Sequence, residues 1–243
     1  YKIQKSNKMK TEKLFAGKTL AIFSGGGDTP AINSSIEAVR NRASMLGFKV
    51  YGVLRGWKGL LGEGDIVDLT NIPYNGIYGG TGLLSSRTNP FPSKKNPEDR
   101  SQQIIRNIEK YKIDVLVTIG GDDTNGAAKR MYETYGIPVI GFPKTIDNDL
   151  RTRTMHHYNG KQYETVLCPG FASGAMQIKK MTAKLHTTNE SHQRIMVLEV
   201  MGRDAGWLTG TASFGGAQLS LIPEVEMTKE RKDFFFELVK ERY

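Results

Sequence analysis

Residues 19–33, TLAIFSGGGDTPAIN, place a short apolar run directly before a cluster of glycines and the start of a helix. The run over 19–24 is typical of a strand that is buried on both faces. Pro30 suits the first turn of a helix. Apolar residues then recur at steps of three and four as far as Leu46, and Gly47 is placed to end the helix. This strand–turn–helix unit predicts an α/β protein.

The same alternation continues along the chain. Short apolar runs separated by amphipathic stretches are the pattern of a parallel sheet covered by helices. A segment over 56–96, rich in Gly, Asn, Pro and Ser, predicts long loops with short elements. The remaining elements predicted here are strands over 48–54, 113–119 and 137–142, and helices over 98–110 and 125–135.

A change of amino-acid composition after Asp149 indicates a domain boundary. The stretch that follows, RTRTMHHYNGKQYE, is polar and has no clear period, as in a crossing between domains. We therefore expect a flexible basic tail over 1–16, an α/β domain over 17–150 and a second, incomplete α/β domain over 151–243. The elements predicted in the second domain are a helix over 171–185, a strand over 194–200 and a final helix over 228–243.

Composition excludes several classes of protein. The single cysteine, Cys168, cannot form an internal disulfide, which argues against a disulfide-stabilised secreted scaffold. No apolar run approaches the roughly 18 residues that span a bilayer, so we expect no membrane segment and a cytoplasmic location. The chain carries 34 basic and 25 acidic residues, a net charge of +9. Because the basic residues form no stripe interleaved with aromatics, small anions are favoured over nucleic acid.

Four sharp turns follow one another along the chain, each rich in glycine, aspartate or both. They span Ser24–Asp28, Gly79–Thr81, Gly120–Thr124 and Pro143–Asp149. Glycine lets backbone N–H groups close on an anion, and a helix that follows adds unpaired donors and a positive dipole end. One such turn is explained by turn geometry alone. Several in one α/β unit, some bearing carboxylates, predict a phosphate-binding site at the carboxyl ends of the strands.

Other phosphate and catalytic motifs are missing. The sequence has no GxxxxGK[ST], no GxGxxG with an acidic residue about 20 positions on, and no serine nucleophile elbow. Four His residues and one Cys give no zinc spacing, and His156 and His157 in the polar stretch are expected to be solvated. Carboxylates beside phosphate-binding glycines are what magnesium-assisted phosphoryl transfer requires, together with a base for the attacking hydroxyl and cations that offset charge.

Taken together, these motifs make the sequence resemble a known family. Over about Lys18 to Met227 the chain is similar to the 6-phosphofructokinases, in motif order and spacing. The resemblance implies two similar parallel-sheet, Rossmann-like domains with the active site in the cleft between them, the second domain truncated here, and a homodimer or homotetramer. It rests on the motifs GGGDTPAIN, GGTGLLSSR, GGDDT, PKTIDND, MGRDAGW and IPEVE.

The resemblance also implies roles for residues on the donor side. Gly26, Gly27, Arg87 and Thr124 correspond to residues that bind the phosphoryl donor, and Asp122 to the residue that holds Mg²⁺.

On the acceptor side, the resemblance makes Asp147 the general base that takes the proton from the 1-hydroxyl of fructose 6-phosphate. It makes Arg203 the residue that stabilises charge in the transition state. Arg194 corresponds to an arginine that reaches the sugar phosphate across a subunit interface. The residues that share a role in substrate binding are Thr145, Ile146, Asp147, Asp149, Arg194, Met201, Gly202, Arg203 and Glu224.

Two positions bear on whether the phosphoryl donor is ATP or pyrophosphate. Users of ATP in this family typically carry Gly where this chain has Asp123, and bacterial ATP users carry Gly where it has Lys144. A carboxylate at 123 occupies the volume of a nucleotide α-phosphate and carries the same sign of charge. An ammonium at 144 can bind the donor and offset charge during transfer. Both residues predict pyrophosphate as donor and a reversible glycolytic reaction that gives fructose 1,6-bisphosphate.

Three alternatives stay open: an ATP-dependent 6-phosphofructokinase, a catalytically incomplete phosphate-binding relative, and a related GGD-type kinase acting on NAD or a lipid. The MGR and IPEVE motifs argue against the last. Some residues also have plainer structural explanations: Asp28 as a helix cap, Asp149 as a turn residue, Arg87 and Arg194 as surface charges, and Met201 as a core residue.

Overall fold

The computed structural model describes residues 14–63, 65–93, 96–150, 155–164 and 167–242. The chain divides into two compact units, Tyr1–Lys144 and Thr145–Tyr243, called unit 1 and unit 2 below. Most of the tail expected over 1–16 lies outside the described residues. No described helix combines the length and apolar character needed to cross a membrane.

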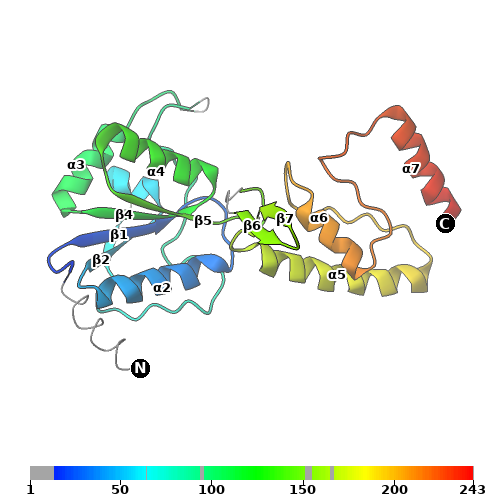
Figure 1. Cartoon of the computed structure of the whole chain (residues 1–243), viewed down its shortest axis with the longest axis horizontal. Helices are drawn as coiled ribbons and strands as arrows, with labels where there is room; N and C mark the ends of the chain where they lie inside the picture. Colours follow the sequence, from blue (N-terminus) through cyan, green and yellow to red (C-terminus); the bar gives the residue numbers. More distant parts are fainter. Residues whose placement is uncertain (1–13, 64, 94–95, 151–154, 165–166, 243) are drawn as a thin grey trace. The chain divides into compact units, whose positions relative to one another are not determined.

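Unit 1 is built on a five-stranded sheet in the order β3-β2-β1-β4-β5 (Figure 1). The strands β2, β1, β4 and β5 run parallel, and β3 pairs antiparallel with β2. The predicted α/β class with a parallel sheet is confirmed. The bounds are β1 (Thr19–Ser24), β2 (Lys49–Val53), β3 (Ile66–Asp68), β4 (Val115–Gly120) and β5 (Val139–Pro143).

Helices cover both faces of this sheet, which explains the uninterrupted apolar run in β1. Figure 1 shows α2 on one face and α3 and α4 on the other. Leu20 and Ile22 belong to the core cluster that includes residues of α2, whereas Ala21 and Phe23 belong to the cluster that includes residues of α3 and α4. Strand β1 is therefore buried on both faces. The helix bounds are α2 (Ala31–Met45), α3 (Ser101–Tyr111) and α4 (Asp122–Tyr135).

Helix α4 begins earlier than the sequence predicted, at Asp122 instead of 125. Gly121 is its N-cap residue, so the helix follows β4 with no intervening loop, and Asp122 and Asp123 lie in its first turn. Carboxylates are favourable there because the helix dipole presents its positive end. The early start places two acidic side chains at the carboxyl end of the sheet.

The glycine-rich segment over 56–96 contains two short elements, the π-helical turn η1 (Gly59–Glu63) and strand β3. Its anchor is Trp57, which is 1% exposed. The indole Nε1 of Trp57 donates a hydrogen bond to the backbone O of Thr124 at 3.2 Å. A buried indole N–H needs such a partner. This contact fixes the first turn of α4 against the segment that follows β2.

Unit 2 contains a hairpin and several helices. Its hairpin is formed by β6 (Met155–Tyr158) and β7 (Lys161–Glu164), two strands that the sequence did not predict in the polar stretch after Asp149. Asn159 and Gly160 both have positive φ, at 49° and 70°, and form the two-residue connection that suits a tight hairpin. The helices are α5 (Phe171–His192), α6 (Trp207–Ala212), η2 (Ser213–Gly215) and α7 (Lys229–Arg242).

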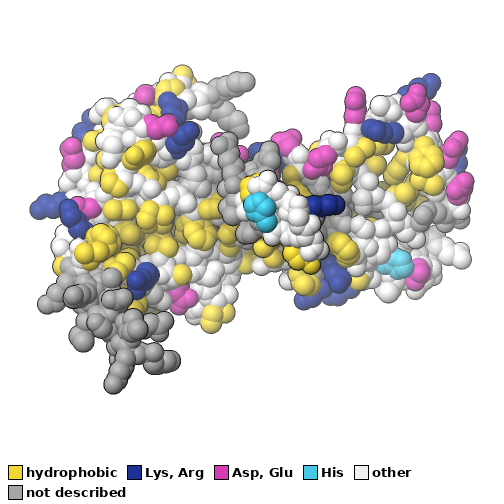
Figure 2. Space-filling view, viewed as in Figure 1, with side chains coloured by type: hydrophobic (Ala, Val, Ile, Leu, Met, Phe, Trp, Pro, Cys, Tyr) yellow, Lys and Arg dark blue, Asp and Glu magenta, His cyan; other side chains and the backbone are white. Residues whose placement is uncertain are grey.

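The strand predicted over 194–200 is wrong. Helix α5 continues to His192, and the apolar run that follows it pairs with no strand among the described residues. Its Val197 is 94% exposed, and the run lines a hollow of 1030 Å³ together with residues of α5 and α7. Figure 2 shows hydrophobic side chains on the surface of this unit beside α7. A strand exists only with a hydrogen-bonded neighbour, which an apolar run alone cannot predict.

Candidate active site

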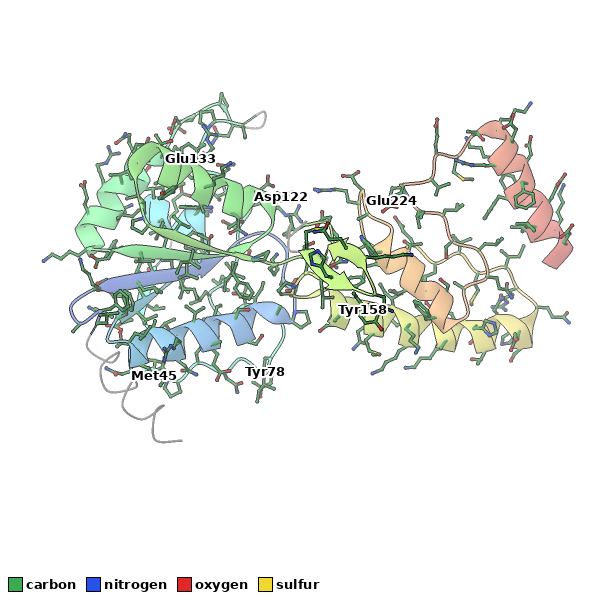
Figure 3. The ribbon with its side chains drawn as sticks, viewed as in Figure 1. Met45, Tyr78, Asp122, Glu133, Tyr158 and Glu224 are labelled. Atoms are coloured by element: carbon green, nitrogen blue, oxygen red, sulfur yellow. The ribbon has the colours of Figure 1, made fainter. Side chains whose placement is uncertain are left out.

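The residues predicted to bind the phosphoryl donor lie in unit 1, near the point where the strand order of the sheet reverses. Strands β1 and β4 are neighbours, and the chain leaves β1 toward β2 but leaves β4 toward β5. The N–H of Gly25 donates to the O of Ile119 at 2.9 Å, so the turns after the two strands lie side by side. In open α/β sheets this is where ligands bind. Figure 3 places Asp122 at this end of α4, with Glu133 near the other.

Thr124 fills the space between the two glycine turns. A Cβ built on Gly25 would lie 2.3 Å from the Oγ1 of Thr124, and one built on Gly120 would lie 2.5 Å from its Cβ. Both positions therefore require glycine. The Thr124 side chain is 6% exposed, so it is buried against these turns. Its contact with a phosphoryl donor stays a prediction.

This packing predicts that Gly25→Ala lowers the free energy of unfolding by about 1–3 kcal/mol, because Thr124 and the turn must move apart. Gly27→Ala is the matched control, since a Cβ there meets no atom within 4 Å. Its effect should stay within about 0.5 kcal/mol. Denaturant unfolding of the two variants measures the difference. Equal free energies of unfolding for the two variants would contradict the packing of Thr124 between the two glycine turns.

A second glycine segment is bonded to the first turn. The hydroxyls of Ser24 and Thr81 are 2.9 Å apart, and Ser24 Oγ donates to the O of Leu84 at 3.1 Å. The N–H of Gly26 donates to the O of Ser86 at 3.0 Å. Three of the four predicted turns are thus held at one end of the sheet. Arg87, predicted to bind the donor, follows directly and is exposed.

Lys144 brings a cation to the same turns. It follows β5, and its N–H donates to the O of Gly120 at 3.0 Å. The side chain is buried, at 4% exposure, and its Nζ donates to the O of Gly27. The ammonium also lies 3.6 Å from where a Cβ on Gly26 would be. A buried cation beside backbone turns that bind anions can offset the charge of a bound phosphate.

The two carboxylates of α4, on Asp122 and Asp123, are exposed. Among the described residues, no three His, Cys, Asp or Glu side chains gather into a preformed metal site. Mg²⁺ is usually held by one or two carboxylates and by phosphate oxygens of the substrate. A single exposed carboxylate such as that of Asp122, at the edge of the sheet where the glycine turns meet, fits this mode of binding.

The predicted base, Asp147, lies in a tightly bonded turn of unit 2. The N–H of Thr145 donates to the O of Pro169 at 3.2 Å, and the N–H of Asp147 donates to Thr145 Oγ1 at 3.0 Å. Asn148 has a φ of 58° and is buried, and its Oδ1 accepts the N–H of Cys168 at 2.8 Å. Sequence reasoning missed the roles of Asn148 and Cys168. The signal for the first is that asparagine tolerates left-handed backbone.

Three of the predicted acceptor residues are brought into defined contacts. Arg203 Nη2 lies 3.6 Å from the Oδ2 of Asp149, and Arg203 Nε lies 3.1 Å from the Oδ2 of Asp204. Sequence reasoning did not single out Asp204. Glu224 Oε1 accepts the N–H of Gly206, the N-cap of α6, at 2.8 Å. Two carboxylates thus lie close to the exposed guanidinium of Arg203.

The remaining acceptor residues differ in their surroundings. Gly202 has a φ of 150°, and a Cβ there would lie 2.4 Å from the O of Ala205, so only glycine fits this turn. Met201 is 70% exposed, which rules out the core role considered from sequence. Arg194 is also exposed, and Ile146 is half-buried. These placements leave the predicted contacts with fructose 6-phosphate as predictions.

Comparison with known proteins decides the family. Residues 19–242 match the family model described as PFK: Phosphofructokinase. The chain belongs to the phosphofructokinase family.

Members of this family with two different donors are similar to the chain. The pyrophosphate--fructose 6-phosphate 1-phosphotransferase of Streptomyces coelicolor is 41% identical over 218 residues, which cover 87% of this chain and 58% of the relative. The ATP-dependent 6-phosphofructokinase of Chloroflexus aggregans is 38% identical over 221 residues, with the same two coverages, 87% and 58%. The chain thus spans less than two thirds of these relatives, and identity alone does not distinguish the donors.

Solved phosphofructokinase structures share the fold. The pyrophosphate-dependent phosphofructokinase of Marinobacter aquaeolei matches with a TM-score of 0.72 and 25% identity, covering 93% of this chain and 57% of that one. The match agrees with the Rossmann-like fold that the motifs implied.

Proposed function

We propose that this chain transfers a phosphoryl group from pyrophosphate to the 1-hydroxyl of fructose 6-phosphate, giving fructose 1,6-bisphosphate and phosphate. The observation that carries the choice of donor is the pair Asp123 and Lys144. Asp123 is exposed in the first turn of α4, and Lys144 reaches the Gly27 carbonyl from the end of β5. Both side chains therefore belong to the edge of unit 1 where the glycine turns meet.

Electrostatics and volume favour the smaller donor. The family resemblance puts the α-phosphate of a nucleotide at the position of Asp123. Two like charges about 4 Å apart repel by about 1 kcal/mol in water and about 4 kcal/mol at an effective dielectric constant of 20. Pyrophosphate has no third phosphate or nucleoside to place there. The acidic side chain thus discriminates against ATP by repulsion.

The proposed reaction uses Asp147 and two cations. The carboxylate of Asp147 takes the proton of the 1-hydroxyl as the sugar oxygen forms a bond to the nearer phosphorus of pyrophosphate. The bond from that phosphorus to the bridging oxygen breaks, and the bridging oxygen leaves with the other phosphate. Lys144 and Arg203 offset the charge that develops. Mg²⁺ held by Asp122 would supply further neutralisation of the donor phosphates when bound.

The wider setting is part of the same proposal. Because pyrophosphate carries no more than one phosphoanhydride bond, we propose a reversible glycolytic reaction in the cytoplasm. We also propose a homo-oligomer, a dimer or tetramer, in which Arg194 reaches the sugar phosphate of a neighbouring subunit.

ATP-dependent relatives resemble the chain almost as closely as the pyrophosphate-dependent ones, which favours an ATP-dependent 6-phosphofructokinase as the second candidate. A catalytically incomplete phosphate-binding relative, the other alternative from the sequence, is the third.

The test incubates the purified chain with fructose 6-phosphate, Mg²⁺ and either pyrophosphate or ATP. Fructose 1,6-bisphosphate is followed by phosphorus NMR and by a coupled assay. We expect product with pyrophosphate, little with ATP, and none after chelation of the metal. Product with ATP alone would establish the second candidate. Binding of a donor with no product in either reaction would establish the third.

A further inference from the structure

One buried side chain in unit 1, that of Asn33, uses all of its hydrogen-bonding capacity on residues in and around the second glycine turn. Its Oδ1 accepts the hydroxyl of Tyr74 at 2.7 Å and the N–H of Gly82 at 2.8 Å. Its Nδ2 donates to the O of Tyr78 at 2.9 Å and to the O of Gly79 at 3.2 Å. Asn33 is 5% exposed. An asparagine amide has two donors and one acceptor oxygen with two lone pairs, so every position is used.

The place of Asn33 connects this network to the donor side of the site. Asn33 lies in the first turn of α2, which follows the Gly25–Asp28 turn. Figure 3 shows Tyr78 beside the N-terminal end of α2, far from Met45 at its other end. A Cβ on Gly80 would lie 3.7 Å from the Oδ2 of Asp28, so the second glycine turn faces the first.

Tyr74 completes the network from the other side. The N–H of Gly82 donates to the Tyr74 hydroxyl at 3.0 Å as well as to Asn33. Burial raises the pKa of the Tyr74 hydroxyl, which keeps the proton that it donates to Asn33. A Cβ on Gly82 would lie 2.6 Å from the Tyr74 Oη, so the close approach depends on glycine. Two donors, the Tyr74 hydroxyl and the Gly82 N–H, thus meet at the Oδ1 of Asn33.

Farther along the same segment, Thr81 is hydrogen-bonded to Ser24 and the O of Ser86 accepts the N–H of Gly26, both in the first glycine turn. Segment 79–87 is therefore held by Asn33 at its start and by Ser24 and Gly26 farther along, just before Arg87. We infer that Asn33 is a positioning residue that fixes the 79–87 segment for binding of the phosphoryl donor. The inference rests on the proposed function, since it takes this segment as part of the donor site.

Asn33→Asp tests the inference, because aspartate has the same shape but presents an oxygen to the carbonyls of Tyr78 and Gly79. We expect the KM for pyrophosphate to rise about tenfold or more, and the KM for fructose 6-phosphate to stay within about twofold. Tyr74→Phe removes both bonds of the hydroxyl, to Asn33 and to the Gly82 N–H, and should raise the same KM by about two- to fivefold, since Asn33 keeps its other three bonds. Ser34→Ala is the matched control, because Ser34 bonds only to the Ala31 carbonyl of its own helix and is exposed.

Calorimetric titration with Mg-pyrophosphate gives the same comparison for these variants and the unmodified chain without relying on turnover. Circular dichroism melting shows whether Asn33→Asp is folded. A folded variant with unchanged donor affinity would overturn the inference, and so would equal rises in KM for both substrates. If the unmodified chain uses only ATP, and Asn33→Asp raises the KM for ATP, the role of Asn33 is supported and pyrophosphate as donor is contradicted. If the unmodified chain binds neither donor, the inference falls with the proposed function.

Discussion

Asp147→Asn is expected to slow phosphoryl transfer to fructose 6-phosphate by about 10²–10⁴-fold. The amide keeps the shape of the side chain but cannot take the proton of the 1-hydroxyl. The backbone of this turn is held by Thr145 and by buried Asn148, so the loss should fall on chemistry more than on structure. Accordingly kcat should collapse, and KM for the sugar should change by less than about threefold.

Steady-state rates at saturating pyrophosphate measure this effect. Asp233→Asn in α7 is the control, because Asp233 is an exposed carboxylate of unit 2 outside the proposed machinery. It should leave kcat unchanged. A near-normal rate for Asp147→Asn would assign the base to another group.

Asp123→Gly is expected to raise the ratio of kcat/KM for ATP to that for pyrophosphate by about tenfold or more, because the change removes both a charge and a volume from the α-phosphate position. Asp123→Asn separates the two effects, since it removes the charge and keeps the volume. If repulsion dominates, the Asn variant should show most of the gain.

The control for this series is Glu133→Gln on the same helix. Glu133 lies 3.6 Å from Lys129 and near the end of α4 away from Asp122 (Figure 3). It should leave the ratio of the two donors unchanged. An unaltered donor ratio in Asp123→Gly would refute the proposed basis of donor choice, even if the chain proves to use pyrophosphate.

Much of unit 1 could be predicted because local pattern and tertiary structure agree there. The apolar run over 19–24 becomes β1 with those bounds, since its burial on both faces is what an uninterrupted apolar strand signals. The glycine turns were also predictable. At Gly25 and Gly120 the requirement for glycine comes from the tertiary contact with Thr124, which no local pattern contains.

The errors have distinct physical origins. The hairpin of β6 and β7 carried a readable signal, the pair Asn159-Gly160, but polar composition hid it. The run over 194–200 has strand-like composition and no partner among the described residues of unit 2. A strand depends on hydrogen bonds with neighbouring strands, and a single sequence does not show which segments those will be.

Within the candidate site, sequence motifs indicated which residues to examine but not how they are held. Lys144 was predicted as a cation near the donor, and the structure adds its burial and its bond to Gly27. Asn33 lay inside a recognised motif with no role assigned. Its four partners come from residues 74–82, more than 40 positions away, so only the folded chain shows the network.

Titration of the unmodified chain with Mg-pyrophosphate and with Mg-ATP, followed by calorimetry, tests the choice of donor most directly. It needs neither a variant nor turnover. The account predicts that pyrophosphate binds about tenfold or more tightly than ATP, a difference of about 1.4 kcal/mol or more. ATP binding as tightly as pyrophosphate, or more tightly, would contradict it.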